Sequence, residues 1–204
     1  MKKTILFSLL TLLAIHSMAQ KEEDEDQKKP LFKKEHFFTG GTVNLAFGNQ
    51  STTLGISPFF GYSINKYIDV AASVGYNYIS QRDNLYLGDK LRQTVYGPGA
   101  FVRLFPVKFL FAQAQYEFNF LRLKYIFPSN TGMPNEKYKF DAHSLLVGGG
   151  FASGRDLSDQ KSYYYISILW DVANARNSPY KDNLNRAVPI IRAGYNIALF
   201  QGKK

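Results

Sequence analysis

The sequence contains no cysteine, which excludes disulfide bridges, thiolate metal sites and a lipidated N-terminal cysteine. Long hydrophobic runs are equally scarce. Beyond the first twenty residues, no apolar stretch approaches the ~20 residues that a membrane-spanning helix needs. Histidine is also rare, and only His36 and His143 follow the N-terminal segment. Neither lies in metal-ligand spacing, so we expect no metal site and no cofactor.

The N-terminus has the pattern of a secretory signal peptide. Lys2 and Lys3 precede an apolar run from Ile5 to Ile15, and small residues follow up to Ala19. The alternative is a membrane-anchoring helix, but the apolar run has only about half the ~20 residues of a membrane span. The sequence therefore predicts a signal peptide over residues 1–19 and an exported mature chain.

Charge is distributed unevenly along the chain. Residues 20–36 hold five Lys and six Asp or Glu, a net charge of −1, with almost no apolar residues. We expect a disordered, solvated periplasmic tail there. The formal net charge is +9, of which the signal peptide supplies +2, so residues 37–204 carry +8. An exported chain rarely meets nucleic acid, so an anionic membrane surface is the expected partner.

From residue 37 onward, apolar and polar residues alternate. In "FAQAQYEFNF", residues 111–120, Gln113, Gln115, Glu117 and Asn119 fall on one side and apolar residues on the other, and this period of two predicts a strand. Abundant Phe, Tyr and Gly suit strands and tight turns. The pattern predicts eight strands: Phe37–Gly48, Thr52–Ser63, Tyr67–Ser80, Gln93–Phe105, Lys108–Leu123, Phe140–Ala152, Ser162–Asn174 and Val188–Phe200.

The connections between these strands alternate in length. Residues 64–66 and 106–107 are tight turns, whereas residues 81–92, 124–139 and 175–187 form long polar connections. Two connections depart from the alternation, because 49–51 is short where a long loop is expected and 153–161 is long where a turn is expected. The alternation indicates an antiparallel meander with two unlike ends.

The two faces of the predicted strands differ in kind. One face carries large apolar side chains without charge, such as Val70, Val74 and Ile168, whereas the other carries glycines and small polar groups. The polar face has too few charges for a water-exposed exterior, and it fits the cramped interior of an eight-stranded barrel. Tyr62 and Tyr96 are among the tyrosines at strand ends, as in interfacial girdles. Residues 37–204 are therefore predicted to form an all-β, antiparallel, up-and-down transmembrane β-barrel; a soluble β-sandwich or lipocalin-like barrel is the alternative.

Ionisable residues on the interior face need partners, because an unpaired buried charge costs several kcal/mol. The residues are Asp69, Arg103, Glu117, Asp171 and Arg192. Positions on neighbouring strands predict the pairs Asp69–Arg103 and Asp171–Arg192, with Glu117 joining whichever arginine its depth allows. The alternative is an ion or proton pathway, but such interiors are normally filled by their own side chains.

One residue pair invites a catalytic reading. His143 and Ser144 resemble the residue types used by outer-membrane enzymes that modify lipid A. Adjacent strand residues point to opposite faces, so His143 is badly placed to activate Ser144, and Asp141 orients it only weakly. Gly148 to Gly150 lack the spacing of a phosphate-binding loop and indicate strand. We therefore expect no catalytic residues, with a lipid A-modifying enzyme kept as the alternative.

The chain resembles the small eight-stranded outer-membrane β-barrel family of the OmpA and OmpX type. The closing segment "RAGYNIALF" carries the most specific part of this resemblance. Its matching positions are Arg192, Gly194, Ile197, Leu199 and Phe200.

The resemblance implies insertion into the outer membrane by the barrel-assembly machinery, with outer-membrane lipid and lipopolysaccharide as surroundings. Members serve mostly as structural anchors, adhesins or resistance factors. The expected function is a structural or interaction role through extracellular loops or as a subunit of an envelope complex with a protein partner. A narrow passive channel is a further alternative.

Overall fold

The computed structural model describes residues 33–47, 51–83, 87–128, 131–155, 161–181 and 186–201. The predicted signal peptide and most of the predicted tail lie outside the described residues. Eight antiparallel strands form a closed barrel in which each strand pairs with its sequence neighbours and β1 pairs with β8. The strands are β1 Phe37–Phe47, β2 Ser51–Asn65, β3 Ile68–Arg82, β4 Lys90–Val107, β5 Leu110–Ile126, β6 Glu136–Ser153, β7 Tyr163–Asp171 and β8 Ile190–Ala198.

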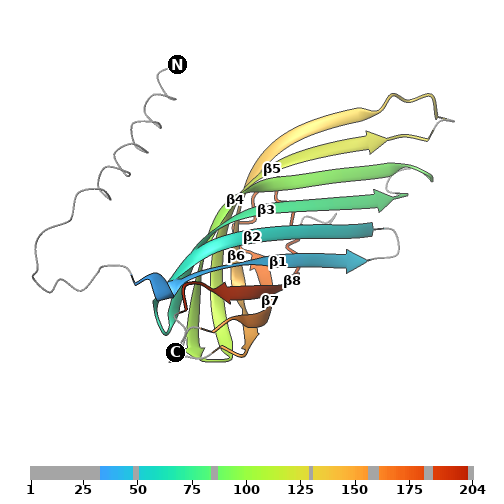
Figure 1. Cartoon of the computed structure of the whole chain (residues 1–204). Coiled ribbons are helices and arrows are strands. Elements are labelled where there is room, and N and C mark those ends of the chain that lie inside the picture. Colours follow the sequence, from blue (N-terminus) through green and yellow to red (C-terminus); the bar gives the residue numbers. More distant parts are fainter. Residues whose placement is uncertain are drawn as a thin grey trace, which may run out of the picture. The chain divides into compact units, whose positions relative to one another are not determined.

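The barrel has two unlike ends. The turn end holds the start of β1, the end of β8 and the turns after β2 and β4, whereas the loop end holds the connections β3–β4, β5–β6 and β7–β8. The eight-stranded meander of the sequence prediction is confirmed. At the loop end, β3 to β6 project beyond β7 and β8 (Figure 1).

Strand lengths depart from prediction at the loop end. β4 begins at Lys90 rather than Gln93 and β6 at Glu136 rather than Phe140, because these charged segments pair across strands with the end of β5. β7 instead stops at Asp171, three residues before the predicted end. Among the described residues, no helix is long and apolar enough to cross a membrane.

The first turn at the turn end is built by a side chain. The Asn65 Oδ1 accepts hydrogen bonds from the backbone N–H groups of Tyr67 at 2.8 Å and Ile68 at 3.0 Å, the geometry of an Asx turn. Before β1, Lys34–His36 form a 3₁₀ turn, and the His36 Nδ1 lies 2.7 Å from the Ser63 carbonyl oxygen. The last residues of the predicted tail therefore contact the barrel, while the extent of the tail stays a prediction.

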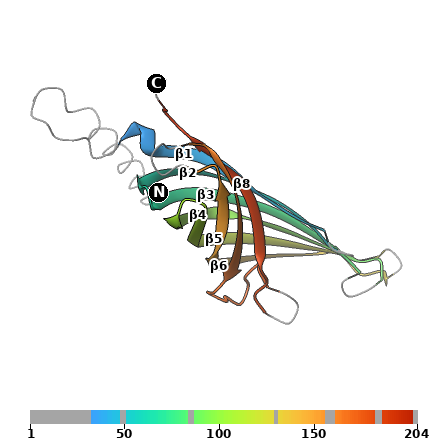
Figure 2. The same ribbon diagram turned by 90° about the horizontal axis from the view of Figure 1, so that it is seen from below.

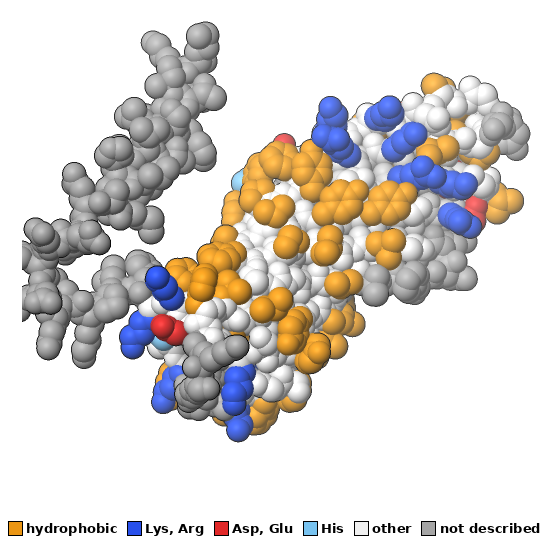
Figure 3. Space-filling model, in the orientation of Figure 1, with side chains coloured by type: hydrophobic (Ala, Val, Ile, Leu, Met, Phe, Trp, Pro, Cys, Tyr) orange, Lys and Arg blue, Asp and Glu red, His pale blue; other side chains and the backbone are white. Residues whose placement is uncertain are grey.

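The faces of the strands have the predicted orientation. In β5 the side chains of Gln113, Gln115, Glu117 and Asn119 are buried in the barrel, and Tyr116 on the other face is exposed. Large apolar residues cover the exterior, with Val74 60% exposed. Figure 3 shows hydrophobic side chains across the middle of one exterior face, with Lys and Arg toward both ends.

The interior near the turn end differs from prediction because it is aromatic rather than small and polar. Its buried rings are Phe38, Phe59, Phe101, Phe105, Phe111, Tyr163 and Tyr165.

Glycines make room for four of these rings. Phe38 pairs with Gly61, Phe59 with Gly40, Phe111 with Gly150 and Tyr165 with Gly194 across neighbouring strands. A Cβ at any of these four glycines would lie 2.4–2.6 Å from a ring atom of its partner. Each ring therefore lies over its glycine and fills space that a second side chain would otherwise occupy.

Candidate functional site

The turn end of the lumen is organised around Asp69 on β3. Arg155, in the β6–β7 connection, donates from Nη1 to Asp69 Oδ2 at 2.7 Å and from Nη2 to Oδ1 at 3.3 Å. The Ser63 hydroxyl donates to Asp69 Oδ1 at 2.7 Å, and the Tyr163 hydroxyl donates to Oδ2 at 3.4 Å. The Arg155 guanidinium also lies 3.5 Å from the Phe105 ring centroid. The carboxylate is thus fully engaged at a buried position.

A row of hydrogen-bonded side chains continues from Arg103 along β5. The Arg103 Nε donates to Gln113 at 2.8 Å, Gln113 donates to Gln115 at 2.7 Å, and Gln115 donates to the Glu117 Oε1 at 2.8 Å. Each carboxamide accepts from one neighbour and donates to the next, so the row runs from a cation to an anion. This row explains why one face of β5 carries amides. Arg103 and Glu117 lie too far apart to pair directly, and the amides connect them through a chain of hydrogen bonds.

Arg103 is held chiefly by aromatic rings. Its guanidinium lies 4.0 Å from the ring centroid of Tyr165, 4.5 Å from that of Phe101 and 5.1 Å from that of Phe111. Cation–π attraction strengthens when the cation is removed from water, and Arg103 is only 1% exposed. The rings therefore stabilise a buried charge that forms no ion pair among the described residues.

Glu117 is the second centre of buried charge. The Arg192 Nη2 of β8 donates to the Glu117 Oε1 at 2.9 Å across the barrel. Tyr180, in the β7–β8 connection, donates its hydroxyl to the Glu117 Oε2 at 2.5 Å and accepts from Arg192 at 3.2 Å. Burial, together with the adjacent carboxylate, raises the pKa of Tyr180 well above its ordinary range. The hydroxyl therefore stays protonated and fastens the connection to the lumen.

The five predicted lumen residues are all buried, but their predicted partners are wrong in two cases. Asp69 and Arg103 face each other in the β3–β4 register, yet Asp69 pairs with Arg155 and Arg103 turns to the rings and Gln113. Asp171 does not pair with Arg192. It accepts instead from the Ser178 hydroxyl at 2.5 Å and from the backbone N–H groups of Leu145 and Ala173.

Sequence reasoning missed Arg155 and Tyr180, because both lie in connections that fold into the barrel. The signal for Arg155 is the β6–β7 connection, which is too long for a turn. It begins with Gly154, whose φ is 86°, and Arg155 comes next. The signal for Tyr180 is an aromatic residue within a polar loop. Together the rings, the amide row and these two side chains occupy the lumen from the turn end to Glu117.

The exterior of β3 to β6 near the loop end carries a cluster of basic side chains. Arg92, Lys124 and Lys137 are successive cross-strand partners on β4, β5 and β6, and Thr94, Arg122 and Lys139 form the adjoining row. Arg82 of β3 and Lys90 of β4 are cross-strand neighbours farther toward the loop end. We call these cations the basic face: Arg82, Lys90, Arg92, Arg122, Lys124, Lys137 and Lys139.

The row next to the basic face is aromatic. Tyr76, Tyr96 and Phe120 are successive cross-strand partners on the exterior of β3, β4 and β5. The Arg122 guanidinium lies 5.1 Å from the Tyr96 ring centroid, which joins the cation rows to the aromatic row. Moving outward along the exterior, apolar residues thus give way to rings and the rings give way to cations.

Carboxylates do little to neutralise the basic face. Glu136 lies on the other face of β6 from Lys137 and Lys139, and its carboxylate accepts a hydrogen bond from the Tyr138 hydroxyl. Asp141 lies on the same face, beside Phe120 in the aromatic row. None of the seven cations forms an ion pair within the described part of the chain. Their side chains therefore remain available to an anionic ligand.

The comparisons with known proteins concern the fold alone. No protein-family model and no curated protein matches the sequence. Among solved structures, the chain is similar to the Ail protein of Yersinia pestis in complex with the heparin analogue sucrose octasulfate, at 11% identity and a TM-score of 0.49 over 80% of this chain and 99% of that one. Another crystal structure of Ail gives 12% identity and a TM-score of 0.45 over the same shares of the two chains. The N-terminal β-barrel domain of Pseudomonas aeruginosa OprF gives 11% identity and a TM-score of 0.41 over 79% of this chain and 94% of that one.

The positions of His143 and Ser144 do not support the catalytic alternative. His143 lies on the exterior, where its Nδ1 is 2.5 Å from the Tyr116 hydroxyl, whereas Ser144 is fully buried on the interior. The strand separates the two side chains, as the alternation predicts. This pair cannot place a base beside a nucleophile.

The residues of the proposed assembly signal lie on and just beyond β8. Arg192 belongs to the lumen network, Gly194 accommodates the Tyr165 ring, and Ile197 is exposed on the exterior. Leu199 follows the strand and donates its backbone N–H to the Phe37 carbonyl at 2.9 Å, and Phe200 is exposed. Their role as an assembly signal stays a prediction.

Proposed function

We propose that this chain is an integral outer-membrane protein without enzymatic activity, and that its basic face binds phosphate groups of outer-leaflet glycolipid, as in lipopolysaccharide. The observation that carries the proposal is the succession of exterior rows from apolar to aromatic to cationic. Its role is structural or one of interaction within the envelope, with the loop end outside the cell. The barrel-assembly machinery is the expected partner during insertion.

The exterior apolar belt supports membrane insertion. On β4 it runs from Tyr96 to Leu104, nine residues, close to the ~9–11 residues that a tilted transmembrane strand needs. Around most of the closed barrel, pairing between neighbouring strands satisfies the backbone groups without water, as a bilayer requires. The aromatic row of Tyr76, Tyr96 and Phe120 then lies at the outer interface, where such rings gather.

The depth of the basic face supports the choice of ligand. The row of Thr94, Arg122 and Lys139 begins one step beyond the aromatic row, at the level of lipid headgroups. Cross-strand neighbours lie ~5 Å apart, so several cations approach one phosphate group together. Arginine and lysine both bind phosphate, arginine with two parallel hydrogen bonds.

A pair of matched double variants tests the proposal. Lys124→Gln/Lys139→Gln removes two charges from the basic face, and Lys66→Gln/Lys108→Gln removes two from the turn end. Fluorescently labelled lipopolysaccharide is titrated into the refolded full chain at low and high salt. At ~1 kcal/mol per cation, we expect about a thirtyfold loss of affinity for the first variant and little change for the second. Equal losses from both variants would contradict the proposal.

The filled lumen disfavours a passive channel. Arg103, Gln113, Gln115 and Glu117 occupy the lumen as one hydrogen-bonded row, and rings fill its turn end. We expect planar bilayers that contain the protein to show no discrete conductance steps. Regular single-channel openings that vanish in a Glu117 variant would instead establish a pathway.

A further inference from the structure

The seam between the first and last strands opens at the loop end. The β1–β8 register runs from Phe38–Ala198 to Val43–Ala193 and stops there. β1 nevertheless continues to Phe47, and β8 begins at Ile190. In Figure 2, β8 diverges from β1 toward this end. Within the described residues, the part of β1 after Val43 and the part of β8 before Ala193 are therefore not paired with each other.

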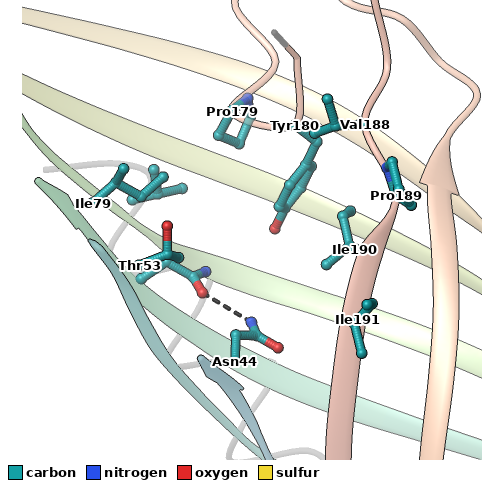
Figure 4. Close-up of a pocket in the computed structure, with 11 residues that line it drawn as sticks. Asn44, Thr53, Ile79, Pro179, Tyr180, Val188, Pro189, Ile190 and Ile191 are labelled. Atoms are coloured by element: carbon teal, nitrogen blue, oxygen red, sulfur yellow. Dashed lines mark hydrogen bonds between the residues drawn. The ribbon is translucent and has the colours of Figure 1, made fainter. Parts of the chain in front are cut away.

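A cavity of about 260 Å³ lies at this seam. Its walls come from both sides of the opening: Asn44 of β1 on one side, and Ile190 and Ile191 of β8 on the other. Tyr180 lies between these walls (Figure 4). Ile191 is 60% exposed on the exterior of the barrel, whereas the Tyr180 hydroxyl is bound to the lumen network. The cavity therefore connects the mouth of the lumen with the outside of the barrel wall.

The cavity is mostly apolar with one polar side. Ile79, Val95, Val188 and Ile190 supply aliphatic surface. On the wall that includes β1 and β3, across the cavity from Val188 and Ile190, the Asn44 Nδ2 donates to the Asn77 Oδ1 at 3.0 Å (Figure 4). Asn44 is 6% exposed, and its Oδ1 has no hydrogen-bond partner among the residues that the structure describes. A buried acceptor without a donor is costly, so this oxygen is a ready partner for a ligand that donates a hydrogen bond.

The depth of the seam indicates where a ligand would come from. Ile191 pairs with Ile168, and Trp170 and Val172 lie farther toward the loop end while still exposed on the exterior. On the other side of the seam, Val43 is 47% exposed. The opening is thus bordered by the apolar exterior, close to its outer edge. An amphiphile in the outer leaflet would reach the cavity without crossing water.

We infer that this cavity is a binding site for a small amphiphile, with an aliphatic body and one hydroxyl or amide N–H group, that enters laterally between β1 and β8. The aliphatic body packs against Ile79, Val95 and Ile190. The donor group satisfies the Asn44 Oδ1 beside Asn77. Pockets of this composition, apolar with a few converging polar groups, are typical of small-molecule sites. The site is separate from the basic face and does not depend on it.

Photolabelling tests the site in the full chain. The protein is placed in lipid nanodiscs with an eight-carbon alkanol that carries a diazirine, and the labelled residues are identified by mass spectrometry. A matched alkyl diazirine without the hydroxyl is the comparison probe, and unlabelled 1-octanol is the competitor. Ile79→Trp fills the cavity, and Val74→Trp places the same side chain on the exterior of the same strand. Heat-dependent electrophoretic mobility checks that each variant is folded.

We expect the alkanol to label peptides that contain Ile79, Val95 or Ile190, and 1-octanol to suppress this labelling. Ile79→Trp should abolish it and Val74→Trp should leave it unchanged. Asn44→Leu should weaken binding of the alkanol about fivefold, the cost of one hydrogen bond. Labelling confined to exterior residues, or equal labelling by both probes, would overturn the inference. Binding of lipopolysaccharide should be the same in these variants, so the two proposals fail separately.

Discussion

Arg155 reaches back 86 positions in the sequence to pair with Asp69 inside the barrel. The guanidinium also donates to the Lys66 carbonyl at 3.3 Å, so it joins the β6–β7 connection to the turn between β2 and β3. These elements lie on opposite sides of the closed sheet order. The ion pair therefore stabilises the turn end across the lumen, where strand pairing alone cannot.

Removal of Arg155 should destabilise the barrel strongly. Arg155→Ala leaves the buried Asp69 carboxylate without its cation, which costs about 3–5 kcal/mol of unfolding free energy. Urea unfolding in lipid vesicles, followed by Trp fluorescence, measures this loss. Asp69→Ala/Arg155→Ala should recover part of it, because no unpaired charge remains. Exposed Arg92→Ala is the control, and an equally small effect of Arg155→Ala would contradict the prediction.

Tyr180 should control the order of the β7–β8 connection. Tyr180→Phe removes a hydroxyl that donates to Glu117 and accepts from Arg192, worth about 1.5–3 kcal/mol for hydrogen bonds to charged groups. The connection should then open more often, which exposes its Arg and Lys residues to trypsin. Mass spectrometry of timed digests should show faster cleavage in this connection.

Tyr76→Phe is the matched control for that digest, because Tyr76 is exposed on the exterior and lies outside the network. It should leave the cleavage rate of the β7–β8 connection unchanged. Identical digestion of both variants and the native chain would mean that the hydroxyl does not fasten the connection.

Glycine positions under aromatic rings should resist even a methyl group. In Gly61→Ala, the new Cβ would lie 2.4 Å from the Phe38 ring and 2.6 Å from the Val70 carbonyl oxygen. The ring or the backbone must shift, which costs about 1–3 kcal/mol. Gly41→Ala is the control, because its Cβ would meet nothing closer than 3.8 Å. Urea unfolding should separate the two variants, and equal stability would show that the ring moves freely.

The period-two pattern predicted the architecture because it reports a local property, the alternation of side chains across a sheet. It placed Gln113 to Asn119 inside the barrel and the apolar residues outside. It also identified Asp69 and Arg103 as neighbours, and the structure confirms their register. Pattern alone could not choose the partners of these charges, because Arg155 and Tyr180 arrive from connections that carry no periodicity.

The aromatic filling of the turn end was missed for a related reason. A ring in the lumen and a ring in the lipid look alike in a list of residue types, and only the alternation along β2 distinguishes the interior Phe59 from the exterior Phe60. The usable signal is the glycine opposite each interior ring, such as Gly40 opposite Phe59. Register, however, depends on turns and loops, and the alternation of neighbouring residues does not determine it.

Trp170, the single tryptophan of the chain, should report direct contact with hydrocarbon. It lies on the exterior of β7, 44% exposed, between the exposed Ile168 and Val172. In vesicles with brominated acyl chains, we expect strong quenching of its fluorescence, because bromine quenches only on contact. Aqueous iodide should have little effect, because the bilayer excludes it.

Leu87→Trp in a Trp170→Phe background provides the control for that measurement. Leu87 is 91% exposed in the β3–β4 connection, beyond the basic face, so its tryptophan should respond to iodide and ignore brominated chains. The contrast between the two positions follows from one orientation only, with the apolar face outward in lipid and the long connections in water. If iodide quenched Trp170 and brominated lipid did not, the exterior would be in water, and neither the glycolipid site nor lateral entry at the seam would stand.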